Sequence, residues 1–172
     1  MKAAPATPRS APSEVLVFLL DREEYGVDIL KVQEIRGYEK PTPIPSAPPY
    51  LKGVVNLRGT VVPIIDLRTK FGFADPRYDA LTVTIILRLA GRTVGVVVDG
   101  VSDAIMLEQG DVKPAPDLRG LADAAFIEGI ATKDGRMVML FDIETFLSDR
   151  ELDLLSRASR SEASPAEALA PP

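Results

Sequence analysis

Short apolar runs, separated by charged or glycine-containing turns, dominate the chain. Most runs are rich in Val and Ile, which favour strands over helices. The runs that predict strands are 15–20, 25–29, 53–57, 60–66, 82–89, 93–98, 127–131 and 136–141. Short turns at 58–59, 90–92 and 134–135 connect consecutive runs, as in β-hairpins. The pattern therefore predicts a mainly β fold.

Helical signals are few and local. Asp66 and Gly72 predict a short helix over 66–71, because aspartate caps a first turn and glycine ends a last one. Ser148 and Glu151 form a capping-box pattern, which predicts the start of a C-terminal helix. The apolar residues of that helix are Leu152, Leu154 and Leu155.

Three further segments are less regular. The apolar spacing in 30–36 suits a helical turn, whereas its Val and Ile residues favour a strand, so both structures remain open. The proline-rich segment 41–49 is predicted to be a long surface connection. Residues 103–120 are predicted to be rich in loops.

Both ends of the chain differ from its middle in composition. Residues 1–13 and 158–172 each contain three prolines among small and polar residues, and neither has apolar periodicity. Such segments bury too little apolar surface to offset the entropy of ordering. We therefore interpret them as disordered tails around one folded unit at 14–157, and expect them to be dispensable for folding.

An internal repeat is the most informative feature of that unit. Residues 51–67 match residues 127–143 at a constant offset of 76 positions, and 25–27 resemble 94–96. The aligned landmarks are Gly53 with Gly129, Gly59 with Gly135, and Asp66 with Asp142. The repeat predicts two similar small β-barrels of about five strands each, with hairpins at 53–66 and 129–142.

The composition excludes most catalytic chemistry. Cysteine and histidine are both absent, which rules out thiol nucleophiles, Cys or His metal ligands and histidine bases. No phosphate-binding glycine loop or calcium-loop motif occurs. We expect no catalytic residue, metal or cofactor, and the remaining enzymatic alternative is a carboxylate-dependent enzyme. Its candidate residues, which we interpret as surface or turn residues, are Asp21, Glu23, Glu24, Asp99, Asp103 and Glu108.

Net charge and hydropathy limit which classes of partner and which cellular location suit this protein. The net charge of −5 argues against a general nucleic-acid-binding protein, which needs a basic face. No apolar run approaches the roughly 18 residues of a membrane helix, and the first residues lack the apolar part of a signal peptide. These features predict a soluble, cytoplasmic protein without direct membrane insertion.

The sequence around Arg58 by itself makes this residue a candidate contact with a partner protein. It lies at a hairpin tip between two apolar strands, where Gly59 can supply a positive φ. An arginine at an exposed turn is usually solvated. The apolar Leu57 beside it and the enrichment of arginine at interfaces favour a contact with a partner instead.

Four ordered motifs carry a resemblance to a known family. Residues 25–37, 52–59, 62–68 and 94–102 are very similar to the corresponding stretches of the CheW family of bacterial chemotaxis coupling proteins. The resemblance covers about 14–157. It implies two intertwined five-stranded SH3-like β-barrels with short helices, in agreement with the repeat.

The resemblance also implies a function. CheW-like proteins are non-enzymatic adaptors that couple the cytoplasmic tips of chemoreceptors to the regulatory domain of the histidine kinase CheA. They are recruited from the cytoplasm to membrane receptor arrays, where ring neighbours are possible further partners. The alternative is a CheW-like scaffold of a non-chemotaxis chemosensory or regulatory pathway.

The family's binding residues map onto named positions of this chain. The receptor-binding positions are Val32, Glu34, Ile35, Arg58, Val83 and Gly95. The kinase-binding positions are Lys52 on the first barrel and Asp117 and Leu118 on the second. Gly95 would permit a close backbone approach. By strand alternation Val83 shares a face with core residues, so a core role is as well supported as a contact.

Overall fold

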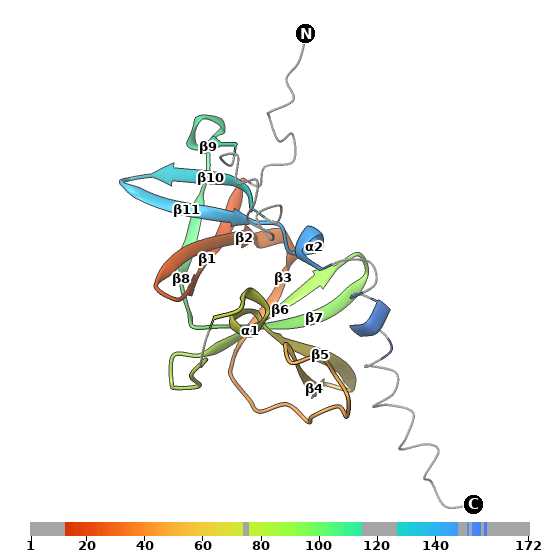
Figure 1. The fold of residues 1–172 in the computed structure, drawn as a ribbon. Coiled ribbons are helices and arrows are strands. Elements are labelled where there is room, and N and C mark those ends of the chain that lie inside the picture. Colours follow the sequence, from red (N-terminus) through yellow and green to blue (C-terminus); the bar gives the residue numbers. More distant parts are fainter. Residues whose placement is uncertain are drawn as a thin grey trace, which may run out of the picture.

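The computed structural model describes residues 13–73, 76–114, 127–147, 151, 153–155 and 157, and its strands form two sheets (Figure 1). The first barrel is a five-stranded sheet with the spatial order β3 (Val32–Gly37), β6 (Val83–Leu89), β7 (Arg92–Val98), β5 (Thr60–Asp66) and β4 (Leu51–Leu57). The second barrel is a six-stranded sheet with the order β8 (Gly100–Met106), β1 (Glu14–Leu20), β2 (Glu23–Asp28), β11 (Arg136–Phe141), β10 (Ile127–Lys133) and β9 (Val112–Lys113). Short helices follow β5 and β11, namely α1 (Leu67–Phe71) and α2 (Ile143–Phe146), and 3-10 turns lie at Ile29–Lys31 and Gln109–Asp111.

The hairpins β1–β2, β4–β5, β6–β7 and β10–β11 share one turn geometry. Each turns through two residues that both have a positive φ. The turn residues are Asp21 and Arg22, Arg58 and Gly59, Ala90 and Gly91, and Asp134 and Gly135. Turns of this type match the right-handed twist of paired strands and so allow tight hairpins.

The two halves of the chain exchange strands. Strands β3, β4 and β5 of the first half share a sheet with β6 and β7 of the second, through the pairs β3–β6 and β5–β7. Strands β8, β10 and β11 share a sheet with β1 and β2, through the pairs β8–β1 and β11–β2. Parallel pairs join the halves at equivalent points, Ile64 opposite Gly95 and Leu140 opposite Gly26. The barrels are therefore intertwined, as the resemblance predicted.

The internal repeat is confirmed at each of its landmarks. Gly53 and Gly129 both follow a bulge at the start of a hairpin. Gly59 and Gly135 both occupy the second turn position with positive φ. Asp66 and Asp142 both cap the helix that follows, accepting hydrogen bonds from backbone N–H groups of its first turn.

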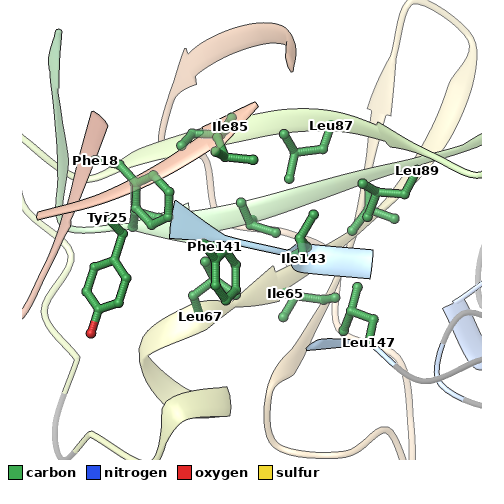
Figure 2. Close-up of a cluster of buried hydrophobic side chains, with 14 of the residues drawn as sticks. Phe18, Tyr25, Ile65, Leu67, Ile85, Leu87, Leu89, Phe141, Ile143 and Leu147 are labelled. Carbon is green, nitrogen blue, oxygen red and sulfur yellow. The ribbon is translucent and has the colours of Figure 1, made fainter. Parts of the chain in front are cut away.

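Among the described residues, three apolar clusters stabilise this arrangement. The largest lies between the barrels and combines residues of both sheets (Figure 2). Its labelled members include Phe18, Tyr25 and Phe141 from the second barrel and Ile85 and Leu87 from the first. Each barrel also has a smaller cluster on its inner face, with Val138 and Leu140 in the second barrel and Val62 and Ile64 in the first. These two pairs are related by the offset of 76 positions in the internal repeat.

The structure corrects or completes four predictions. Residues 103–106, predicted as loop, belong to strand β8, and the second barrel has six strands instead of about five. Segment 30–36 contains both structures that its pattern allowed, a 3-10 turn followed by β3. Residues 151, 153–155 and 157 are helical, and Leu155 is buried in the large cluster. The capping residue Ser148, Leu152 and both predicted tails beyond Ser13 and Arg157 lie outside the described residues.

Candidate functional site

Strand β3 is an edge of the first barrel, and a bulge sets which of its side chains share a face. Its register with β6 shifts between Val32 and Glu34, so that Gln33 is the extra residue. Val32 therefore lies opposite Leu87 and Ile35 opposite Ile85, both on the face of the large cluster. One side of this edge is thus apolar.

Three of the sequence-predicted residues line this apolar side. Val32 and Val83 are half-buried and pack against the large cluster, whereas Ile35 is 44% exposed. Val83 lies opposite Gly37, so the three residues follow one another along β3 and its neighbour. For Val83 the structure supports the core role that alternation allowed, with only its half-exposed part left for a contact.

Glu34 and Arg58 meet on the other side of the same edge. Glu34 lies opposite Ile86 of the inner cluster, and its carboxylate forms an ion pair with Arg58 at the tip of the β4–β5 hairpin. A second ion pair joins Glu34 to Arg36 at 3.3 Å. The hydrogen bond from Arg58 is the main cause that lowers the pKa of Glu34 below its ordinary value, so this group is a carboxylate at neutral pH.

The tip that carries Arg58 is held rigidly. Arg58 has a φ of 51°, and the backbone N–H of Gly59 donates to the Oδ1 atom of Asn56 at 2.8 Å. The Arg58 side chain is exposed although its backbone is constrained. A fixed, exposed guanidinium beside an apolar strip can bind a carboxylate or a backbone carbonyl of a docking helix.

Gly95 lies inside the first barrel. A Cβ atom at this position would come within 2.6 Å of Ile64 Cδ1 and 3.0 Å of Thr84 Cγ2. The sequence suggested that Gly95 permits a close approach. The groups that approach it are side chains of its own barrel. Gly26 occupies the equivalent place in the second barrel, where Val15 and Val138 crowd the position.

A family model described as the CheW-like domain matches residues 14–151. The chain is 47% identical over 148 residues to a chemotaxis protein CheW of Klebsiella aerogenes, covering 86% of this chain and 89% of that protein. It is 35% identical over 138 residues to a chemotaxis protein CheW of Rhizobium meliloti, covering 80% and 89%. The crystal structure of the scaffolding protein TtCheW from Thermoanaerobacter tengcongensis superposes with a TM-score of 0.74 at 32% identity, covering 82% of this chain and 96% of that one.

The chain belongs to the CheW family. In the CheW fold, Lys52, which was predicted to bind the kinase, is the bulged residue of β4 in the first barrel. Lys52 is half-buried and lies between Leu51 and Gly53, where the register with β5 shifts. Asp117 and Leu118, predicted for the second barrel, lie outside the described residues.

Three of the six carboxylates considered for catalysis, Glu24, Asp99 and Asp103, are bound by arginine side chains in this CheW-family chain. Asp99 accepts hydrogen bonds from Arg68 Nη1 at 2.8 Å and from the backbone N–H of Asp21 at 2.7 Å. Glu24 and Asp103 both bind Arg136. Glu108 caps the 3-10 turn at Gln109–Asp111, and Glu23 lies in β2. In the described part of the chain, no three acidic residues gather closely enough to hold a metal ion.

Sequence reasoning missed a buried polar network that the CheW fold builds beside α1. Arg68 is only 2% exposed and donates to both carboxylate oxygens of Asp66, with Tyr78 donating to the same carboxylate at 2.6 Å. Arg68 also donates to the backbone carbonyl of Arg77 at 2.6 Å and thereby ties the segment before β6 to α1. Asp66 was visible as a helix cap, but no pattern indicated its arginine partner.

Proposed function

We propose that this protein is a chemotaxis adaptor that couples the cytoplasmic tips of chemoreceptors to the histidine kinase CheA. Membership of the CheW family supports an adaptor role in chemotaxis signalling. The observation that carries the proposal is the edge strand β3, which has the exposed apolar residue Ile35 on one side and, on the other, Glu34 paired with Arg58 of the β4–β5 tip. Receptor tips are helical, and an edge that is apolar on one side and polar on the other suits a docking helix.

The proposed receptor surface consists of Val32, Ile35 and the exposed part of Val83 on one side and Glu34 with Arg58 on the other. Gly95 supports this surface from within, because its missing side chain leaves room for Ile64 and Ile86 beneath β6 and β7. A surface of this kind gives at most a standard interface of about 800 Å² per partner. Strong coupling therefore requires several weak contacts acting together in an array.

The proposed kinase surfaces lie elsewhere on the molecule. Lys52 at the β4 bulge is proposed as the contact of the first barrel with the kinase regulatory domain, and Asp117 and Leu118 as the contact of the second barrel. Two separate kinase contacts would allow one adaptor to join two kinases or a kinase and a ring neighbour. We propose that the chain works in the cytoplasm and reaches the membrane only through receptors. The described part of the chain contains no helix with the length and apolar character of a membrane span.

A reconstituted coupling assay tests the proposal. Kinase autophosphorylation is measured with a soluble receptor cytoplasmic fragment, with and without this protein. We expect the protein to bind each partner and to make kinase activity depend on the receptor fragment. Binding to the kinase without any binding to receptor fragments would instead favour the alternative scaffold of a pathway without chemoreceptors. Binding to neither partner would refute the adaptor role.

A further inference from the structure

A polar pocket of about 290 Å³ lies at the hairpin end of the first barrel. Its polar lining consists of Gln33, Arg58, Thr60, Arg88 and Thr93. Arg88 and Thr93 face each other across β6 and β7 next to their turn, and Thr60 follows the turn of β4 and β5. The pocket therefore opens where two hairpin tips and the bulge of β3 converge. Among the described residues, no carboxylate lines the pocket.

Arg88 supplies an uncompensated positive charge to this pocket. It follows Thr84 and Ile86 on the inner face of β6, and its side chain is exposed. In the described part of the chain, no ion pair involves Arg88, whereas Arg58 is already paired with Glu34. Of the two described arginines that line the pocket, Arg58 is thus neutralised within the protein and Arg88 is not.

The second barrel provides an internal comparison. At the matching hairpin end, Leu19 and Glu24 pair across β1 and β2 as Arg88 and Thr93 do in the first barrel. The single arginine of the β10–β11 hairpin, Arg136, is bound by both Glu24 and Asp103. Its charges are therefore compensated internally. Because the position equivalent to Arg88 is Leu19 in the second barrel, the fold does not require an arginine there.

We propose that the pocket binds a carboxylate side chain of the protein segment that docks along β3, with Arg88 as the main contact and Arg58 as the second. One uncompensated guanidinium matches the single charge of an Asp or Glu side chain, and Gln33, Thr60 and Thr93 can donate further hydrogen bonds. This inference rests on the proposed function, because the occupant is an acidic residue of the receptor tip. It makes Arg88 a residue that selects among receptor segments by charge.

Arg88→Gln tests the inference, with Arg92→Gln as the matched control. Arg92 belongs to the same hairpin but pairs with Asp153 at 3.2 Å, away from the pocket. The affinity for a receptor cytoplasmic fragment is measured at low and at high salt. We expect Arg88→Gln to weaken binding about threefold or more at low salt, with a smaller difference at high salt, because an ion pair is screened. Arg92→Gln should bind as the parent protein does.

A second arm separates this inference from the proposed function. Sodium acetate is titrated into the protein alone, and the side-chain N–H signals of labelled arginines are followed by NMR. We expect the Arg88 signal to shift most, the Arg58 signal to shift less and the Arg92 signal to stay in place. If the receptor fragment fails to bind the parent protein while acetate shifts Arg88, the proposed function fails and the carboxylate site stands. If Arg88→Gln binds the receptor fragment like the parent, or acetate leaves Arg88 unmoved, the inference is wrong.

Discussion

Glu34 and Asp103 occupy equivalent positions in the two barrels. Each follows a bulge in an edge strand of its sheet, and each accepts hydrogen bonds from an arginine of the opposite hairpin. Arg58 binds Glu34 in the first barrel, and Arg136 binds Asp103 in the second at 2.9 and 3.0 Å. The two arginines are not equivalent, because Arg58 is a turn residue whereas Arg136 is the first residue of β11. The two barrels therefore have equivalent ion pairs at their edge strands, but the arginine comes from a different position of the repeat in each barrel.

This difference makes Asp134 the natural control for Arg58. Both are first turn residues with nearly identical φ angles, 52° and 51°. Asparagine adopts this conformation readily, so Arg58→Asn and Asp134→Asn should each leave the free energy of unfolding nearly unchanged. We expect Arg58→Asn to weaken binding of the receptor fragment tenfold or more, and Asp134→Asn to leave it unchanged. Melting curves and calorimetric titrations of both variants measure the two effects, and normal receptor binding by a folded Arg58→Asn variant would contradict the role of Arg58.

Ile35 should contribute apolar contact area with little effect on stability. It is 44% exposed on β3, and Met137 on β11 offers a control because it is 59% exposed. Ile35→Ala should lower receptor affinity by roughly 1 to 3 kcal/mol, as expected when a partly exposed side chain becomes buried at an interface. Met137→Ala should leave that affinity unchanged. Equal losses in the two variants would show that general surface hydrophobicity, and not β3, drives binding.

Gly95 should matter for packing within the barrel. Gly95→Ala should lower the free energy of unfolding by about 1–3 kcal/mol, because the new Cβ atom would lie 2.6 Å from Ile64 Cδ1. Gly26→Ala should lower the free energy of unfolding less, because the nearest side-chain atoms, Val138 Cγ1 and Val15 Cγ2, lie 3.1 Å from its new Cβ atom. Ile64→Val removes the clashing Cδ1 atom. In the Gly95→Ala background, Ile64→Val should therefore lower the free energy of unfolding less than it does in the parent protein. Urea denaturation of the three variants and the double variant measures this coupling, and additive losses would place the effect of Gly95 outside the barrel interior.

Asp66 should make the stability depend on pH in acid. Burial by itself raises the pKa of Asp66, but hydrogen bonds from Arg68 and Tyr78 outweigh burial, and the pKa lies below its ordinary value. A pKa that is lower in the folded state means that the carboxylate stabilises the fold above the ordinary value of about 3.9. This contribution is lost as the pH falls from there through the lower folded pKa.

The variants Asp66→Asn and Asp142→Asn separate a buried ion pair from a helix cap. Asp66→Asn should lower the free energy of unfolding by about 3–5 kcal/mol at neutral pH, because Arg68 stays buried with one partner fewer. Asp142→Asn should cost about 1 kcal/mol, as expected for a helix cap that forms no ion pair with the described residues. If Asp66→Asn does not fold, Tyr78→Phe keeps the carboxylate and should reduce the loss of stability that occurs as the pH falls below about 4. An unchanged acid dependence in Tyr78→Phe would contradict this explanation.

Local pattern alone determined most of the strands, the two-residue turns and the helix caps of this protein. The apolar runs, the two-residue turns such as Asp134–Gly135 and the capping aspartates Asp66 and Asp142 are encoded within a few residues each, and the structure contains them as predicted. The offset of 76 positions identified the two halves, because both halves need glycine at the same bulge and turn positions. Strand β8 was missed because its residues 102–104 are exposed, so the edge strand lacks a regular alternation of apolar and polar positions.

Only the tertiary structure decided which strands share a barrel. An alternating strand defines its two faces but not its neighbours, and nothing local distinguishes pairing of β3 with β6 from pairing within its own half. The exchange of strands between halves brings Glu34 to Arg58 and places Gly95 against Ile64, and neither contact follows from spacing along the chain. The same exchange leaves Arg88 beside Arg58 at one barrel end while Arg136 is fully paired at the other. Long-range pairing is selected by how well whole sheets bury the cluster between them, and that balance involves residues from every part of the fold.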